Sequence, residues 1–390
     1  MPKTSTHRLR SVIGLITATA TATALLAALA PAAGASTPSG TASTSSTLDA
    51  DLRALVTTGA SSALGEVRQD GRTVWRGRAG VADLATGAPV PPDARFRIGS
   101  VTKVFVSTVT LQLAGEQRVV LDDPIEHYLP GAVPNGADIT VRQLLSHTSG
   151  LFNYTEDPII SWPDQAAEQA WLDGGRWKTY TADDLVRVAT AHPPYFAPGQ
   201  GYHYSNTDYL VIGMLIERVT GRSWQDEVER RIIRPLGLHA TAMPDTSPDI
   251  QGPHTKGYFD LPTGPADVTR FNPSIAGSAG AGISDATDLA RFTAALTGGR
   301  LLQPAQLAQM EQPSPQSGAN RYGLGLVRFD TPCGVFFGHD GGIFGYQNMV
   351  VSSADGRRQA VMEFTPYQQE NPGIEAAKSA LLSAEMCATK

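Results

Sequence analysis

Charged residues are scarce in this 390-residue chain, and cysteines are nearly absent. Asp, Glu, Lys and Arg together make up 17% of the residues, the formal net charge is −6, and there are two cysteines. The acidic balance excludes the basic surface that nucleic-acid binding requires. No internal repeat is visible, which excludes fibrous and solenoid classes. Hydrophobic residues reach 41%, so the chain is too apolar for a disordered protein and has the composition of a globular one.

Long apolar runs are also missing, except at the N-terminus. There, three basic residues precede an Ala/Leu/Thr stretch over residues 12–30, and Ala33 and Ala35 form a small-residue cleavage pattern. We expect residues 1–35 to be a secretory signal peptide, with a membrane anchor as the weaker alternative. The Ser/Thr/Pro/Gly-rich segment 36–47 is expected to be a flexible leader. The mature protein is accordingly expected to be secreted, with no stable membrane insertion.

The two cysteines are Cys333 and Cys387. An even pair in a chain that is expected to be exported favours one disulfide over a pair of reactive thiols. This disulfide would close a loop of about 55 residues, for which loop entropy gives a stabilisation of about 4 kcal/mol. It would tie the start of a late strand to the C-terminal helix.

Strand-like runs lie at both ends of the chain, and helical patterns separated by Pro/Gly-rich loops lie between them. Asp70-Gly71 stands between two such runs and is typical of a hairpin turn. Strands are expected at 64–68, 73–76, 95–98, 335–338, 346–352 and 358–364, and an amphipathic helix is expected at 374–386. This order predicts an α/β fold in which an antiparallel sheet from both chain ends is flanked by helices and carries an inserted, mostly helical lobe.

Ser100 and Lys103 carry the clearest chemical signal. They open an apolar helix in which Lys103 is the only charged residue as far as Ala114. At a spacing of i, i+3 the two side chains lie on the same face of the first turn. A desolvated lysine has a lowered pKa and can accept the proton of a serine hydroxyl. The alternative is a helix-capping serine beside an unrelated lysine.

A second motif, Tyr204-Ser205-Asn206, stands at the start of another apolar helix. The hydroxyl of Tyr204 can relay a proton between Lys103 and a leaving group. The amide of Asn206 can either hold a substrate carbonyl or steady the lysine. Helix capping by Ser205 or Asn206 is an alternative that is compatible with these roles.

A third motif, His339-Asp340-Gly341 followed by Gly342, comes after a strand-like run. A small residue at position 341 lets a substrate lie against the strand edge. The N–H of Gly342 is a candidate second oxyanion donor beside that of Ser100. The alternative is a glycine-rich turn between two strands.

In this order, S-x-x-K, Y-x-N and H-x-G resemble the signature of the penicillin-recognising serine hydrolases. The resemblance is strongest to the branch that joins class C β-lactamases, secreted D-alanyl-D-alanine carboxypeptidases and related esterases. The same resemblance extends to residues 96–99, 144–151, 198–199, 235–238 and 322–325. It implies one domain over 48–388, with a sheet lobe at 48–115 and 277–388 and a helical lobe at 116–276.

The resemblance also implies residue roles. Ser100 would be the nucleophile, Lys103 its base and Tyr204 the proton relay, while Asn206, His339, Asp340, Gly341 and Gly342 would contact the substrate. The partner would be a small peptide, ester or β-lactam, and neither a metal nor a cofactor is needed. His192 and His203 lack a third ligand at zinc-site spacing. His147 is expected to be structural, holding a loop at a helix end.

One departure from the family pattern concerns substrate choice. Carboxypeptidases of this kind usually carry Thr where this chain has Asp340, and a basic residue where it has Val327. Arg328 follows Val327 directly, but neighbouring residues of a strand face opposite sides of the sheet, so Arg328 is expected to point away. Two carboxylates about 4 Å apart repel by about 4 kcal/mol at an effective dielectric of 20. We predict a D-alanyl-D-alanine carboxypeptidase first. The alternatives are an esterase or amidase acting on substrates without a free carboxylate, and a non-catalytic module that binds peptidoglycan peptides.

Overall fold

The computed structural model describes residues 41–162, 164–367, 371 and 373–388. The predicted signal peptide, residues 1–35, lies outside them. At the centre is a seven-stranded sheet with the order β3-β2-β1-β11-β10-β9-β8. Its strands are β1 (Ala60–Gln69), β2 (Arg72–Asp83), β3 (Ala88–Pro89), β8 (Val327–Thr331), β9 (Gly334–Ile343), β10 (Tyr346–Ser353) and β11 (Arg358–Pro366). All neighbouring pairs are antiparallel, and β1 pairs with β11, which confirms the predicted sheet from both chain ends.

Local turn chemistry explains the hairpins of this sheet. Asp70 and Gly71 have positive φ angles of 52° and 75°, which suits the right-handed twist of β1 and β2. Gly356, with φ of 68°, turns β10 into β11. The strands extend beyond their predicted limits, and β9 runs through residues 339–342. The glycine-rich motif is therefore part of a strand, and the turn falls at Phe344-Gly345.

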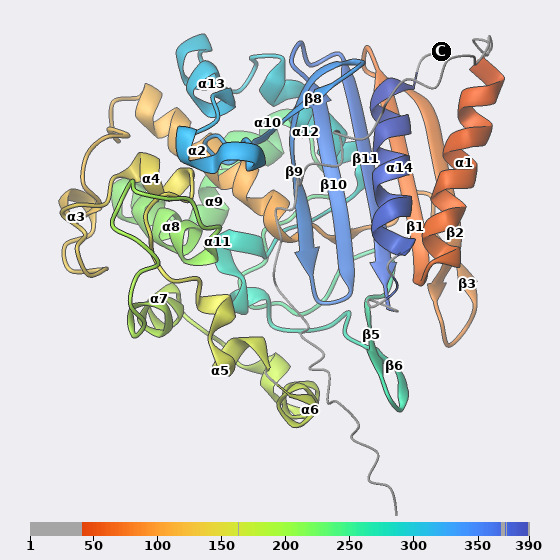
Figure 1. The fold of residues 1–390 in the computed structure, drawn as a ribbon, viewed down its shortest axis with the longest axis horizontal. Helices are drawn as coiled ribbons and strands as arrows, with labels where there is room; N and C mark the ends of the chain where they lie inside the picture. Colours follow the sequence, from red (N-terminus) through yellow and green to blue (C-terminus); the bar gives the residue numbers. More distant parts are fainter. Residues whose placement is uncertain (1–40, 163, 368–370, 372, 389–390) are drawn as a thin grey trace, which may run out of the picture.

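Two helices from opposite chain ends, α1 (Thr41–Thr57) and α14 (Gly373–Cys387), lie side by side on the outer face of the sheet (Figure 1). Helix α1 begins inside the segment 36–47 that was expected to be a flexible leader, so the expectation is wrong for residues 41–47. The reason is tertiary, because Leu48, Leu52 and Leu55 are buried against the sheet and hold the whole helix there.

The remaining helices form the lobe on the other side of the sheet and its link to the sheet (Figure 1). They are α2 (Thr102–Gly115), α3 (Ile125–Tyr128), α4 (Val141–Leu145), α5 (Pro158–Ser161), α6 (Gln165–Asp173), α7 (Ala182–Thr190), α8 (Asn206–Thr220), α9 (Trp224–Val228), α10 (Arg234–Leu236), α11 (Gly277–Gly280), α12 (Ala286–Thr297) and α13 (Pro304–Glu311). Two small sheets pair β4 (Phe96–Arg97) with β7 (Ile283–Ser284) and β5 (Tyr258–Leu261) with β6 (Gly264–Asp267). Among the described residues, no helix is both long enough and apolar enough to span a membrane.

Side chains that alternate along each strand divide the interior into two apolar clusters. The inner cluster joins the sheet to the helical lobe and includes Phe337 and Val350. The outer cluster packs the sheet against α1 and α14 and includes Phe336 and Val351. Helix α2 belongs to the inner cluster and is buried almost all round, as its apolar sequence predicts.

The predicted disulfide is present between Cys333 and Cys387. It connects the turn between β8 and β9 to the last residue of α14. The closing helix is thus tied covalently to the strand that carries the third motif.

Candidate active site

Ser100 lies in a single turn of 3-10 helix, Gly99–Val101, directly before α2. Gly99 has a φ of 50°, and a Cβ there would fall 2.8 Å from both the N and the O of Gly342. Only glycine allows this approach without a clash. The nucleophile turn therefore lies against β9 at the glycine expected to supply the second oxyanion donor.

Lys103 is fully buried one turn after Ser100. Its Nζ lies 3.1 Å from the Ser100 hydroxyl, 2.7 Å from Oδ1 of Asn206 and 2.8 Å from the carbonyl of Ala279. Burial lowers the pKa of Lys103 well below its usual value, against smaller opposing effects of Asp340 and Asp208. A neutral amine can donate its two N–H groups to Oδ1 of Asn206 and to the carbonyl of Ala279. Its lone pair is then left to accept the proton of the serine hydroxyl. This geometry is that of a general base.

Tyr204 lies over the same pair, with the Nζ of Lys103 4.8 Å from its ring centre. Burial raises the pKa of Tyr204 well above its usual value, and a hydrogen bond with Ser100 opposes part of that rise. The contact is loose, because no described residue meets the Tyr204 hydroxyl at full hydrogen-bond geometry. The two hydroxyls are thus neighbours that a reacting group could bridge.

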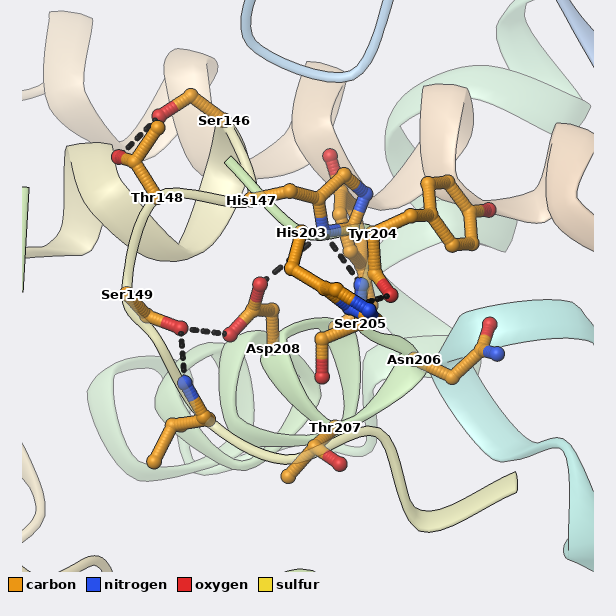
Figure 2. Close-up of polar contacts among 12 residues, drawn as sticks. Ser146, His147, Thr148, Ser149, His203, Tyr204, Ser205, Asn206, Thr207 and Asp208 are labelled. Atoms are coloured by element: carbon orange, nitrogen blue, oxygen red, sulfur yellow. Dashed lines mark hydrogen bonds and ion pairs between the residues drawn. The ribbon is translucent and has the colours of Figure 1, made fainter. Parts of the chain in front are cut away.

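Asn206 is buried, and its amide is already engaged. Its Oδ1 accepts from Lys103, while its Nδ2 donates to Oδ1 of Asn153 at 3.2 Å and to the Thr155 hydroxyl at 3.3 Å. Of the two roles open to it from the sequence, the geometry matches steadying the lysine. Figure 2 shows Asn206 and Tyr204 directed to the same side of the segment that carries them.

His339 is also buried, with 1% of its side chain exposed, and its Nε2 lies 3.0 Å from the hydroxyl of Tyr322. Burial lowers the pKa of His339, against an opposing effect of the neighbouring Asp340. At Gly341, a Cβ would fall 2.0 Å from the carbonyl of Ile98, so β9 touches the chain just ahead of the nucleophile turn. At Gly342, a Cβ would meet open space. Beyond Gly338, where its pairing with β8 ends, β9 pairs only with β10 among the described strands.

Asp340 is more exposed than its neighbours, with 21% of its side chain accessible. Its charge is felt by Lys103, Tyr204 and Tyr202, whose pKa values it raises. Arg328 follows Val327 on β8, and Arg321 lies just before the stretch 322–325. Both bind Asp330, at 2.5 Å and 2.9 Å. Val327 is buried at the start of β8.

The structure thus gathers Ser100, Lys103, Tyr204 and Asn206 in one cluster, with Gly342 beside it and His339 behind it. Three participants were not identified from the sequence. The carbonyl of Ala279 and the amide of Asn153 come from distant segments with no local signal. Tyr322 belongs to one of the stretches that matched the family, and that match was its only signal.

The helical lobe carries tryptophans that include Trp162, Trp171 and Trp177. Trp162 and Trp171 are 5% exposed, and their rings lie 4.5 Å apart between centroids. Phe344, just after β9, packs against both. These three side chains belong to a buried core that supports the β9–β10 turn. Trp177, in contrast, is 42% exposed.

Comparison with protein-family models matches the family described as Beta-lactamase over residues 48–362. This chain belongs to the β-lactamase family of serine hydrolases. The predicted family, fold and enzyme class are therefore confirmed.

Curated relatives of this hydrolase carry several activities in their names. It is 30% identical over 299 residues to penicillin-binding protein 4 of Amycolatopsis lactamdurans, covering 70% of this chain and 74% of that protein. It is 30% identical over 225 residues to esterase EstB of Burkholderia gladioli, covering 53% and 56%. It is 31% identical over 309 residues to a D-aminopeptidase of Brucella anthropi, covering 76% and 55%. The matched region spans little more than half the length of the last two.

Solved structures extend the likeness to nearly the full length. A D-stereospecific amidohydrolase from a Streptomyces species superimposes with a TM-score of 0.79 at 38% identity, covering 89% of this chain and 99% of that one. A D-amino acid amidase from Ochrobactrum anthropi in complex with D-phenylalanine gives a TM-score of 0.74 at 26% identity, covering 88% and 98%.

Proposed function

We propose that this serine hydrolase is a D-stereospecific amidase that cleaves amides of D-amino acids with a free α-amino group. Two lines of support favour it over the carboxypeptidase that the sequence put first. The solved structures described above are named as amidohydrolases and amidases of D-amino acids. The charge pattern at the free edge of β9 points the same way.

That charge pattern is the observation that carries the proposal. Asp340 is a partly exposed carboxylate on β9, close enough to the cluster to raise the pKa values of Lys103 and Tyr204, while Arg321 and Arg328 are both paired with Asp330. A substrate carboxylate would meet repulsion with neither arginine free to offset it. An α-ammonium group would be attracted instead, by about 4 kcal/mol at 4 Å before desolvation.

The proposed reaction proceeds through an acyl-enzyme. Lys103 takes the proton of Ser100 as Oγ attacks the amide carbonyl, and the N–H groups of Ser100 and Gly342 hold the oxyanion. Tyr204 passes a proton from Lys103 to the leaving nitrogen, and the C–N bond breaks. Water then attacks the ester and passes a proton through Tyr204 to Lys103, and Lys103 returns it to Oγ of Ser100 as the C–O bond breaks and the acid leaves. Each oxyanion donor contributes about 3–4 kcal/mol.

The first test is covalent labelling. A fluorophosphonate should label the wild type at Ser100 and leave Ser100→Ala unlabelled, as read by mass spectrometry. Labelling equal in both proteins would remove Ser100 as the nucleophile, and labelling of neither would favour the peptide-binding module.

The second test is substrate choice. We expect D-alaninamide to be cleaved at least tenfold faster than L-alaninamide, N-acetyl-D-alaninamide or N-acetyl-D-alanyl-D-alanine. Asp340→Thr should erase the advantage of the free amine and raise the rate on the carboxylated peptide about tenfold or more. Asp355→Asn, which removes a charge in the distant β10–β11 turn, is the matched control. A preference for the acetylated dipeptide in the wild type would restore the carboxypeptidase, and a preference for p-nitrophenyl esters would favour the esterase.

We also propose that the mature enzyme is secreted. The N-terminal pattern of residues 1–35 and the disulfide Cys333–Cys387 support export to an oxidising compartment. Intact mass measurement of the protein from culture medium should give a chain that begins near Ser36. A cell-associated protein with its N-terminus intact would contradict this.

A further inference from the structure

His147 and Asp208 form a fully buried pair that the proposed reaction does not use. His147 follows α4 in a left-handed conformation with φ of 57°, and Asp208 lies in the first turn of α8. The Nδ1 of His147 is 3.0 Å from Oδ2 of Asp208, and the Ser149 hydroxyl donates to the other carboxyl oxygen at 2.5 Å. Figure 2 shows these contacts beside the segment that carries Tyr204.

The residues on both sides of Tyr204 are hydrogen-bonded to His147. Before Tyr204, the N–H of His203 donates to the backbone carbonyl of His147 at 3.1 Å. After it, the N–H of Ser205 donates to the imidazole Nδ1 at 3.2 Å. The rings of His147 and Tyr204 lie 4.3 Å apart between centroids. One residue therefore fixes the backbone on each side of Tyr204 and packs against its ring.

The contacts at Nδ1 also indicate where the proton lies. A backbone N–H can only donate, so Nδ1 accepts from Ser205 and carries no proton. Asp208 meets the same nitrogen, so both contacts are hydrogen bonds only if its carboxyl group is protonated and shares the Nδ1 lone pair with the Ser205 N–H. Burial acts in the same direction, because it raises the pKa of Asp208 and lowers that of His147 well away from their usual values.

We propose that His147 and Asp208 are a positioning pair, held as neutral imidazole and neutral carboxylic acid, that fixes the Tyr204 hydroxyl over Ser100 and Lys103. The pair rests on the proposed role of Tyr204 and touches no reacting atom. Its neutrality matters for the base, because an ionised Asp208 would favour the ammonium form of Lys103. The other titratable side chains that the described residues place around His147 are Lys103 on α2, His339 on β9, His203, and the tyrosines Tyr202, Tyr204, Tyr209 and Tyr322.

Two substitutions of Asp208 separate a neutral acid from an anion. The amide of Asp208→Asn can donate to Nδ1 and accept from Ser149, so this variant should keep kcat within about fivefold and leave the pH profile of kcat unmoved. Asp208→Leu can do neither and should lose about 10²-fold in kcat with KM changed less than threefold, since a misplacement of about 1 Å costs that much. If Asp208→Asn lost as much as Asp208→Leu, the pair would be ionised and the proposal overturned.

His147→Phe keeps a ring of similar size but removes Nδ1, and it should lose about 10²-fold in kcat. The matched control is His192→Phe, because His192 lies 2.7 Å from Asp157 in a second His–Asp pair of the helical lobe, outside the catalytic cluster. The control should keep kcat. A His147→Phe variant that also kept kcat would refute positioning by this residue.

Nitrogen-15 NMR of the wild type reads the tautomer directly and does not depend on whether any variant folds. His147 should give the signals of a neutral ring protonated at Nε2 from pH 6 to 9. A ring protonated at Nδ1, or at both nitrogens, would refute the neutral pair. Fluorophosphonate labelling of the wild type is run in parallel, so that failure of the proposed function is seen separately.

Discussion

The two faces of the central sheet bury very different kinds of side chain. On the inner face, Lys103, His147, Asp208 and His339 are all buried within one connected polar cluster. On the outer face, α1 and α14 cover the sheet with leucines and other apolar residues. The inner face carries the proposed chemistry, and the outer face joins the two ends of the chain.

The difference shows how burial can serve two purposes in one domain. On the outer face, burial removes apolar area from water at about 25 cal/mol per Å², which stabilises the fold. On the inner face, burial shifts pKa values, and this costs free energy unless each polar group finds a partner. Lys103 meets this condition with three partners, whereas the outer-face Glu385 has no hydrogen-bond partner for either carboxyl oxygen among the described residues.

The sharpest contrast is expected from Lys103→Met on the inner face. It removes the proposed base, so kcat should fall about 10³-fold or more. Stability should change by less than about 2 kcal/mol, because losing the hydrogen bonds to Asn206 and Ala279 is offset by no longer burying an amine. Ester hydrolysis and denaturant unfolding measure the two quantities. Activity within tenfold of the wild type would show that Lys103 is not the base.

Removing the disulfide should give the reverse result, a loss of stability without a loss of kcat. Replacing Cys333 and Cys387 together by serine should lower the free energy of unfolding by about 2–4 kcal/mol, because the unfolded chain regains its loop entropy. At a temperature where the variant stays folded, kcat should be unchanged. Guanidinium unfolding and ester hydrolysis test this pair of expectations. A loss of kcat in the folded variant would mean that the disulfide also shapes the site.

The smallest effect is expected from Glu385→Gln, which concerns pH. Burial raises the pKa of Glu385 well above its usual value, so the folded state holds a proton that the unfolded state releases above about pH 4.5. The stability that this proton provides is complete below that pH and is lost as pH rises toward the folded pKa. Glutamine mimics the protonated form, so the variant should match the wild type near pH 4 and be more stable than the wild type at pH 8.

Unfolding curves at both pH values measure that difference. Glu375→Gln, which changes an exposed residue of the same helix, is its control and should show no such pH dependence. Equal stability of Glu385→Gln and the wild type at pH 8 would show that burying this carboxyl group does not lower the free energy of unfolding.

The sequence by itself determined the fold class, the disulfide and the Ser100–Lys103 pair. These follow from local rules, since strand alternation, an Asp-Gly turn and a spacing of i, i+3 each depend on a few neighbouring residues. The order of the three motifs was enough to identify the family. The leader was misjudged because residues 41–47 are polar, and only the distant leucines that follow them hold the helix on the sheet.

The tertiary structure alone decided how each polar side chain is used. Asn206 holds Lys103, His339 binds Tyr322, and both arginines near Asp340 are taken up by Asp330. His147 was expected to be structural, yet its place beneath Tyr204 depends on α8 meeting the end of α4. A hydrogen bond depends on distance and direction, and residues 60 or 100 positions apart acquire these only when the chain has folded.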